Sequence, residues 1–382
     1  MPGLNVAASR ILVVGAGFAG AVHARTLAEA GCLVDVIDRR PHIAGNAYDE
    51  IDVTGVLVHV YGPHLFHTNN ARVVEWVQRF GTWIPYEHRV QAQLPDGRLV
   101  PLPVNRHTIN EMYGISLETD RDVQDFLARI GIPVAAPANA AEYLYAHLGR
   151  EITDLLFRPY TRKMWTLDLE DLDVSVVRRL PIRYDTEDRY FPNDKFQFMP
   201  RGGYTKLFER ILDHSGIRVH LSTSYVHGME AGYRHVFNSM PIDEYFGYNL
   251  GELPYRSIRF HRRHVQSWRL EGAAVINYTD SRPYTRETSW HLLPCHVRQK
   301  TGRRTLTIEE PCDYRENAME RYYPVKTADG RFVALYERYR EMAADLRNMS
   351  FIGRCGTYQY LDMHQVINQS LKHAEGWLAA AR

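Results

Sequence analysis

A glycine-rich turn near the N-terminus has the spacing of a dinucleotide-binding motif. Gly15, Gly17 and Gly20 follow the apolar run 11–14 and precede a segment with the composition of a helix. Bare backbone at such a turn can approach a diphosphate closely, and the N-terminus of the following helix favours negative charge. The sequence therefore predicts a strand, a phosphate-binding turn and a helix.

An acidic residue ends the next predicted strand. Asp38 follows the apolar run 33–37 and lies eighteen residues beyond Gly20, where a carboxylate accepts hydrogen bonds from a ribose hydroxyl. Arg39 and Arg40 come directly after it. They leave a second interpretation open, because an arginine there can accommodate the 2′-phosphate of NADP.

Two other residue types could bind a metal, but their arrangement argues against it. His64 and His67 have H-x-x-H spacing without the glutamate of a helical H-E-x-x-H frame. The four cysteines lie far apart and form no Cys-x-x-Cys pair. The sequence therefore predicts free thiols and no metal site.

The composition excludes several classes of protein. Of the 382 residues, 46 are basic and 45 are acidic, and this net charge of +1 argues against a nucleic acid as the main partner. No apolar run approaches the roughly 18 residues that span a bilayer. Residues 1–10 lack the pattern of a secretion signal. We expect a cytoplasmic protein without membrane insertion.

The elements that must position the candidate residues alternate as in a divided α/β chain. The βα rhythm returns at Gly202 and again in a strand, turn and helix at the C-terminus, where Asp362 and Gln365 have capping-box spacing. Helical apolar periodicity starts at residue 71, and short alternating runs start at residue 255. FAD-binding folds are commonly interrupted by insertions in this way.

We therefore predict the fold class α/β, with a discontinuous Rossmann-like FAD-binding domain, an inserted helical domain and an antiparallel β-sheet domain. The FAD-binding domain comprises residues 1–70, 200–245 and 345–382. The mostly helical domain comprises residues 71–178 and ends in a mobile substrate lid. The antiparallel substrate domain comprises residues 179–199 and 246–344.

Several segments carry a closer likeness to known proteins. They are DRRPHIAGNAY at 38–48, HVYGPHLFHT at 59–68, YTRKMW at 160–165, RLPIRY at 179–184 running on to RYF at 189–191, YYP at 322–324 and GRCGTYQYLDM at 353–363. With them the chain resembles the UDP-galactopyranose mutase family, prokaryotic type, from about Ile11 to Leu378.

The resemblance implies an isomerase that interconverts UDP-galactopyranose and UDP-galactofuranose by ring contraction. FAD would be active when reduced, with flavin N5 as the nucleophile at the anomeric carbon and UDP as the leaving group, without net redox change. The partners would be a UDP-sugar substrate and an external electron donor, and the product would supply cell-surface polysaccharide. The sequence does not specify the oligomeric state, for which a homodimer is the expectation.

The resemblance also implies roles for individual residues, among them two arginines that would clamp the substrate diphosphate. The catalytic residues would be His67, Arg179, Arg286 and Tyr360. The substrate-binding residues would be Tyr160, Trp165, Arg179, Tyr190, Asn277, Arg286, Tyr323 and Tyr360. The cofactor-binding residues would be Gly15, Gly17, Phe18, Gly20, Asp38, Arg39, Asn46, His64, Leu65, Tyr225, Arg354, Leu361, Asp362 and Met363.

Departures from the family pattern leave alternatives open. Glu310-Pro311-Cys312 replaces the usual Glu-Tyr-Ser, and Arg321 replaces a proline; we expect these changes to lie near the sugar rather than the flavin. The same chemistry on UDP-N-acetylgalactosamine or a dTDP-deoxyhexose is one alternative. An ordinary flavin oxidoreductase, which would consume its reductant stoichiometrically, is the other. A flavin or nucleotide sensor would bind without turnover, but the set of Arg179, Arg286 and Tyr360 argues against it.

Overall fold

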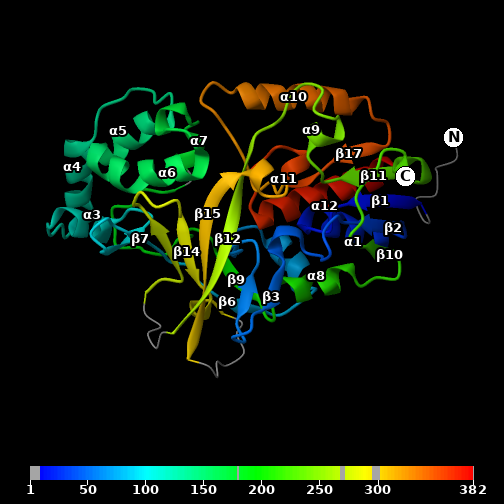
Figure 1. Ribbon diagram of the computed structural model, residues 1–382, viewed down its shortest axis with the longest axis horizontal. Coiled ribbons are helices and arrows are strands. Elements are labelled where there is room, and N and C mark those ends of the chain that lie inside the picture. The colour runs from blue at the N-terminus through cyan, green and yellow to red at the C-terminus, as the bar shows by residue number, and fades with distance from the viewer. Residues whose placement is uncertain (1–8, 179, 267–271, 295–301, 382) are drawn as a thin grey trace.

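A parallel five-stranded sheet lies at the centre of one half of the molecule (Figure 1). The computed structural model describes residues 9–178, 180–266, 272–294 and 302–381. In it, three distant stretches of the chain form this sheet in the order β10-β2-β1-β11-β17. The strands are β1 (Arg10–Val14), β2 (Leu33–Ile37), β10 (Ile217–His220), β11 (His235–Asn238) and β17 (Met349–Phe351).

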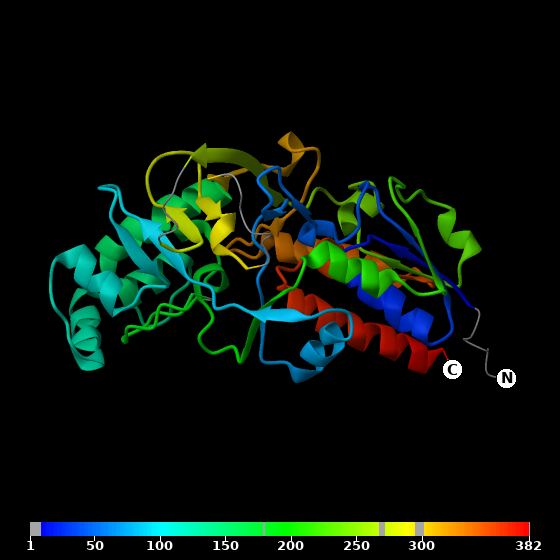
Figure 2. The ribbon, with the colours of Figure 1, turned by 90° about the horizontal axis from the view of Figure 1, so that it is seen from below.

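Three helices cover one face of this sheet and lie side by side (Figure 2). They are α1 (Phe18–Glu29), α8 (Tyr204–Leu212) and α12 (Met363–Ala380). The capping residues predicted for α12 interact as expected, since the backbone N–H of Asp362 donates to Oε1 of Gln365 at 2.8 Å. The other face packs against a smaller cluster that includes Tyr245 and Met229. That cluster draws on α9 (Ile242–Tyr245) and η4 (Met229–Gly232), and α10 (Arg331–Ala344) contacts both α9 and β17.

A seven-stranded sheet forms the second half of the molecule, in the order β16-β12-β15-β14-β13-β7-β8. All its pairs are antiparallel except β7 with β13. Its strands are β7 (Val90–Gln93), β8 (Leu99–Leu102), β12 (Tyr255–Gln266), β13 (Val275–Tyr278), β14 (Arg286–Ser289), β15 (Arg303–Asp313) and β16 (Tyr323–Pro324).

A group of helices packs at the end of the large sheet (Figure 1). The helices are α3 (Arg106–Tyr113), α4 (Asp120–Ile130), α5 (Ala140–Ile152), η2 (Thr153–Phe157), α6 (Arg158–Trp165), η3 (Leu169–Asp171) and α7 (Ser175–Arg178). Val123, Phe126 and Leu127 of the predicted stripe on α4 are buried in their common core.

Short elements connect the two halves. They are η1 (Gly45–Ala47), β3 (Asp49–Ile51), β4 (Leu57–His59), β5 (Phe66–Thr68), α2 (Ala71–Gln78), β6 (Trp83–Pro85), β9 (Phe196–Pro200), η5 (Trp290–Leu292), η6 (Tyr314–Glu316) and α11 (Gly353–Gly356). Strands β5, β9 and β6 form a three-stranded sheet, and β3 pairs with β4.

The predicted fold class is confirmed: a discontinuous Rossmann-like unit, a helical unit and a largely antiparallel sheet are all present. The packing departs from the predicted domain boundaries in two places. The prediction places α2 in the helical domain, but Val73, Trp76 and Val77 are buried in the core of the parallel-sheet unit, where α2 contacts α12. The segment 90–104 belongs to the large sheet, since β7 and β8 form its edge hairpin.

The segment expected to form a substrate lid is anchored by both apolar and charged contacts. Leu169, Leu172 and Val177 are buried in the core of the helical group. Asp168 forms ion pairs with Arg158 and Arg162. The lid stays a prediction, and any closure must carry these anchored residues along.

Within the described ranges, no helix combines the length and the apolar character that crossing a membrane requires.

Candidate cofactor and substrate site

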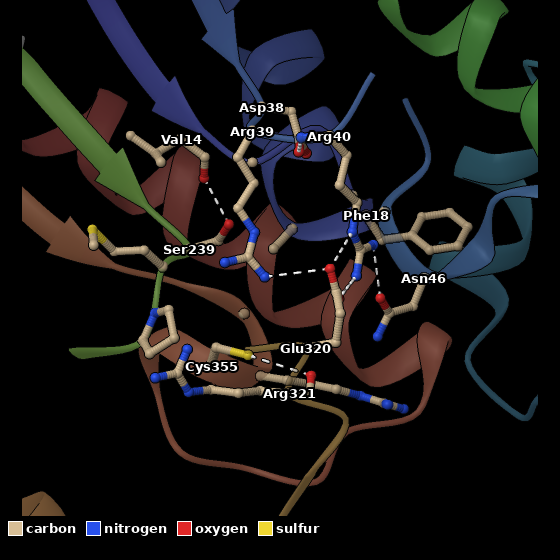
Figure 3. Close-up of a pocket in the computed structure, with 18 of the residues that line it drawn as sticks. Val14, Phe18, Asp38, Arg39, Arg40, Asn46, Ser239, Glu320, Arg321 and Cys355 are labelled. Atoms are coloured by element: carbon tan, nitrogen blue, oxygen red, sulfur yellow. Dashed lines mark hydrogen bonds and ion pairs between the residues drawn. The ribbon is translucent and has the colours of Figure 1, made fainter. Parts of the chain in front are cut away.

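A cavity of about 360 Å³ opens at the carboxyl ends of β1 and β2 (Figure 3). Ligands of open α/β sheets bind at this edge. Most residues predicted to bind the cofactor line it: Gly15, Gly17, Phe18, Asp38, Arg39, Asn46, His64, Tyr225, Arg354, Leu361 and Met363. The cavity is therefore the place where a dinucleotide would lie.

The three glycines of the turn differ in how much space surrounds them. Gly15 has φ +99°, and a Cβ there would lie 2.0 Å from Oγ of Ser239. Gly17 lies against the backbone of Gly45, with 3.6 Å from a built Cβ to its Cα. Gly20 does not line the cavity; a Cβ there would lie 1.8 Å from the carbonyl oxygen of Gly15. Gly15 and Gly20 therefore leave no room for a side chain, whereas a Cβ at Gly17 would make only an ordinary van der Waals contact.

The N-terminus of α1 suits an anionic group. Gly17 is its N-cap, no side chain caps it, and its first turn contains no acidic residue. The Phe18 ring points away from the cavity and packs on Phe208, with 4.5 Å between ring centroids. Backbone N–H groups and the helix dipole therefore face the space where a diphosphate fits.

Asp38 holds the turn as well as facing the cavity. Its Oδ2 accepts from the backbone N–H of Ala16 at 2.7 Å, and its Oδ1 accepts from that of Arg40 at 2.9 Å. Each carboxylate oxygen can accept more than one hydrogen bond, so the predicted contact with a ribose hydroxyl is compatible with both.

Charged side chains from two distant segments cross the cavity. Arg39 and Arg40 both form ion pairs with Glu320, and Arg40 also donates to Oδ1 of Asn46 at 2.9 Å (Figure 3). The sequence suggested Arg40 only as a contact for the 2′-phosphate of NADP, and nothing in it indicated Glu320 as the partner. Their pairing joins positions 280 residues apart in the chain, and no local pattern predicts such a contact.

Arg321 corrects an expectation about the sugar pocket. It lines the cofactor cavity and is almost fully buried, and its Nη1 donates to Glu244 at 2.8 Å. The following residues, Tyr322 and Tyr323, pack instead in the apolar core of the helical group. Of the departures expected near the sugar, Arg321 therefore lies at the cavity predicted for the cofactor.

The C-terminal signature connects the cofactor cavity with aromatic residues predicted to bind the substrate. Nε of Arg354 donates to the carbonyl oxygen of Leu361 at 2.5 Å, and its guanidinium lies 5.0 Å from the ring centroid of Tyr360. Tyr360 stacks on Tyr323 with centroids 5.4 Å apart and planes 18° apart. Trp165 meets Tyr323 nearly edge-on at 6.3 Å. The predicted substrate aromatics thus form a continuous row that ends at the cofactor cavity.

A buried polar cluster on the large sheet lies beside this row. Nη2 of Arg286 donates to Oε2 of Glu309 at 2.7 Å, and Asn277 is opposite Arg286 on the neighbouring strand. Burial works against the charge of Arg286, but Glu309 outweighs it and raises the pKa of the guanidinium well above its usual value.

Three atoms of this cluster are buried without a hydrogen-bond partner among the described residues: Oδ1 of Asn277, Nε of Arg286 and Oε1 of Glu309. Buried polar atoms in a folded protein normally have partners. Atoms left in this state beside a row of aromatic rings are suited to a polar ligand.

His64 lines the cofactor cavity and lies near Arg286. Burial, helped by the nearby His59, lowers its pKa to about 3, and the charges of Arg354 and Arg286 act in the same direction. Its Nδ1 lies 2.8 Å from the carbonyl oxygen of Gly62. A neutral imidazole is therefore held between a residue of the cofactor cavity and the diphosphate clamp predicted for the substrate.

His67 does not line the cavity but is held firmly next to it. Its Nδ1 lies 2.5 Å from Oδ2 of Asp194, and its ring stacks on Phe191 with 3.5 Å between centroids. The pairing of His67 with Asp194 is not evident from the sequence, because the partners are 127 residues apart.

The remaining predicted residues lie in different surroundings. Tyr160 lies near Arg286, and Tyr190 packs edge-on against Phe191. The hydroxyl of Tyr225 donates to Glu230 at 2.5 Å, and the side chain of Leu65 packs in a separate apolar cluster. Asp362 begins α12, and Arg179 lies outside the described residues.

Comparison with known proteins accounts for this arrangement. A family model described as "UDP-galactopyranose mutase" matches residues 155–360, and one for an NAD(P)-binding Rossmann-like domain matches residues 13–80. The chain is 37% identical over 372 residues to the "Probable UDP-galactopyranose mutase" of Klebsiella pneumoniae, covering 97% of this chain and 95% of that one. The chain belongs to the UDP-galactopyranose mutase family. Members of this family are mutases, and hence isomerases, as the sequence analysis predicted.

Three further proteins are similar to this chain. The dTDP-fucopyranose mutase of Escherichia coli is 35% identical over 375 residues, covering 96% of this chain and 98% of that one. The crystal structure of a reduced UDP-galactopyranose mutase matches with a TM-score of 0.75 at 17% identity, covering 97% of this chain and 94% of that one. A putrescine oxidase matches at 0.59 and 14% identity over 98% of this chain and 99% of that one, so the fold is shared with oxidases. The Rossmann-like domain supports a dinucleotide cofactor.

Proposed function

We propose that this protein interconverts UDP-galactopyranose and UDP-galactofuranose with FAD in its reduced form. The observation that carries the proposal is the buried cluster of Asn277, Arg286 and Glu309 beside the Tyr323–Tyr360 stack. This cluster supplies unused hydrogen-bonding atoms next to the cofactor cavity, in a family of sugar-nucleotide mutases. The cytoplasmic location, the external electron donor and the homodimer remain predictions.

The cofactor cavity fits a flavin dinucleotide. The open N-terminus of α1 would hold the diphosphate, Asp38 the ribose, and Arg354 with the start of α12 the flavin end. Bound there in reduced form, FAD supplies the electron-rich nitrogen that the ring contraction requires. A helix N-terminus beside the reduced ring favours its negative charge.

On the substrate side, the proposed role of Arg286 is to bind the diphosphate of the nucleotide. Negative charge grows on that diphosphate as the bond to the sugar breaks, and a guanidinium held by Glu309 needs no reorganisation to stabilise it. Arg179 is proposed as the second clamp.

The aromatic row would orient the substrate and exclude water from the reacting carbon. Trp165 and Tyr160 belong to the same α6 helix and would contact the nucleotide, while the stacked Tyr323 and Tyr360 lie toward the cofactor cavity. Tyr190 and Asn277 are proposed to bind the remaining polar groups of the substrate. Dry surroundings strengthen each of these electrostatic contacts.

The decisive experiment incubates the purified FAD-loaded protein with UDP-galactofuranose, with and without dithionite, and measures UDP-galactopyranose and free UDP. We expect conversion only under reduction, without consumption of further reductant. An equivalent of reductant consumed for each product would instead identify an oxidoreductase. Unchanged substrate in the reduced sample would contradict the proposed specificity.

The E. coli relative favours a second candidate, the same ring contraction on a dTDP-deoxyhexose. The two relatives differ by only two percentage points of identity to this chain, so overall likeness does not choose between their substrates. The same assay with dTDP-fucofuranose, and with UDP-N-acetylgalactosamine as a third substrate, separates them by comparing kcat/KM.

A further inference from the structure

Three potential metal ligands meet where β5 approaches the start of α12. They are His67, Asp362 and His364, and one ligand atom from each lies within 4.8 Å of the others. Nε2 of His67 is 4.0 Å from Oδ2 of Asp362, and the two imidazole rings are 5.2 Å apart at an angle of 70°. The three groups come from segments almost 300 residues apart, so the H-x-x-H spacing of His64 and His67 did not indicate this set.

His67 already has the outer support that a metal-binding histidine needs. The Asp194 carboxylate accepts from Nδ1–H at 2.5 Å, and Phe191 stacks on the ring. A proton held on Nδ1 leaves the lone pair of Nε2 free, and Nε2 is the nitrogen that faces Asp362. The arrangement of carboxylate, histidine and ion is the usual one in protein metal sites, where it fixes the tautomer and raises ligand basicity.

His364 adds an independent observation. Its Nδ1 is buried and has no hydrogen-bond partner among the residues that the structure describes.

We propose that His67, Asp362 and His364 bind one divalent transition-metal ion of the zinc type, with Asp194 supporting His67. Two imidazoles and a carboxylate form a common three-ligand set that leaves a fourth position open. A tetrahedral ion needs ligand atoms about 3.3 Å apart, so the side chains must close by roughly an ångström.

The charge of the site accords with a cation, although α12 begins there. The dipole at the N-terminus of α12 weakens the binding of a positive ion by about 0.3–1 kcal/mol. Asp362 and Asp194 bring two carboxylates to the same place, which outweigh that dipole. Asp362 is partly exposed, with 42% of its side-chain surface accessible, so an ion has a path from solvent.

A bound ion would lie next to the cofactor cavity without belonging to it. Leu361 and Met363 line the cavity, whereas Asp362 and His364, the residues between and after them, are not among its lining. Asp362 begins the helix whose start is proposed to lie at the flavin end, so the ion would lie beside the bound cofactor. Ion binding needs no sugar nucleotide, so the proposal does not depend on which substrate the enzyme uses.

The test is a Zn²⁺ titration of the full-length untagged protein against a chromophoric chelator, without substrate. We expect one tightly held equivalent in the parent protein and its loss in His364→Gln. His147→Gln removes an exposed histidine on α5 and should bind as the parent does. Asp194→Asn, which removes only the charge of the support, should weaken binding by about 10–100-fold.

A second measurement guards against misfolding of the variants. Co²⁺ added to the parent should give visible d–d absorption that is absent from His364→Gln, while thermal unfolding of that variant stays near the parent's. No stoichiometric Zn²⁺ in the parent, or equal binding in parent and His364→Gln, overturns the proposal. Because ion binding is measured without turnover, its failure is separate from any failure of the proposed mutase activity.

Discussion

Arg286 and Glu309 face each other across the neighbouring strands β14 and β15, with Nη2 of the arginine 2.7 Å from Oε2 of the glutamate. Glu309 is only 1% exposed. The pair therefore presents a fixed positive charge whose own counter-ion is buried behind it. A second anion reaching Arg286 from the substrate side would use the guanidinium atoms that Glu309 leaves unused, Nε among them.

Removing the buried counter-ion should destabilise the protein. Glu309→Ala leaves the guanidinium of Arg286 uncompensated. Because 25% of the Arg286 side chain is exposed, we expect the free energy of unfolding to fall by no more than about 3 kcal/mol, the lower end of the cost of breaking a buried pair. Urea unfolding measures the change. Glu310→Ala is the matched control, because the neighbouring carboxylate pairs with the half-exposed His261 and should cost about 1 kcal/mol or less. Equal losses in the two variants would contradict the ion-pair argument.

Replacing the guanidinium of Arg286 with an ammonium should reduce turnover more than it reduces stability. Arg286→Lys keeps a charge near Glu309 but loses the planar fork that matches a diphosphate. We expect kcat/KM to fall by about 10²–10³-fold, with flavin content unchanged. Arg263→Lys is the control. Arg263 is exposed on β12 and does not line the cofactor cavity, so its replacement should leave kcat/KM within about twofold of the parent. Unaltered turnover in the Arg286 variant would remove it from the substrate site.

Local patterns predict the parts of this fold that depend on neighbours in sequence. The turn at Gly15 to Gly20, the start of α8 after Gly202 and Gly203, and the cap of α12 each follow from spacing within one element. The pairing of β7 with β13 and the partners Glu309, Glu320 and Asp194 do not. Each depends on which distant strands or loops meet, and a shift of one residue in register would turn a different side chain inward.

The steric role of Gly15 can be separated from a general cost of positive φ. Gly15→Ala places a methyl group 2.0 Å from Oγ of Ser239, so the Ser239 side chain must turn away and lose its hydrogen bond to the carbonyl oxygen of Val14. Gly97 has a similar φ of +90° at the tip of the β7–β8 hairpin, but a Cβ there meets nothing within 4 Å. We expect Gly15→Ala to be purified without bound flavin and Gly97→Ala to retain it. The absorbance ratio of flavin to protein measures both. Full flavin content in Gly15→Ala would show that the turn does not hold the cofactor as closely as proposed.

Acid sensitivity should arise from a histidine buried between α1 and α12. Burial lowers the pKa of His23 to about 3, despite its Nδ1 lying 2.7 Å from the carbonyl oxygen of Ala19. In the unfolded chain the same histidine has a pKa near 6.5, so the unfolded state binds the extra proton first.

The stability contributed by neutral His23 is therefore complete above about pH 6.5 and is lost progressively as the pH falls toward 3. Between these limits the expected slope is about 1.4 kcal/mol per pH unit for this one group. Urea unfolding of the parent and of His23→Gln at pH 7.5, 6.0 and 5.0 measures it, and the variant should show the shallower slope. His147→Gln, which removes an exposed histidine, should follow the parent. Parallel pH profiles for the parent and His23→Gln would mean that His23 takes up its proton within the folded protein.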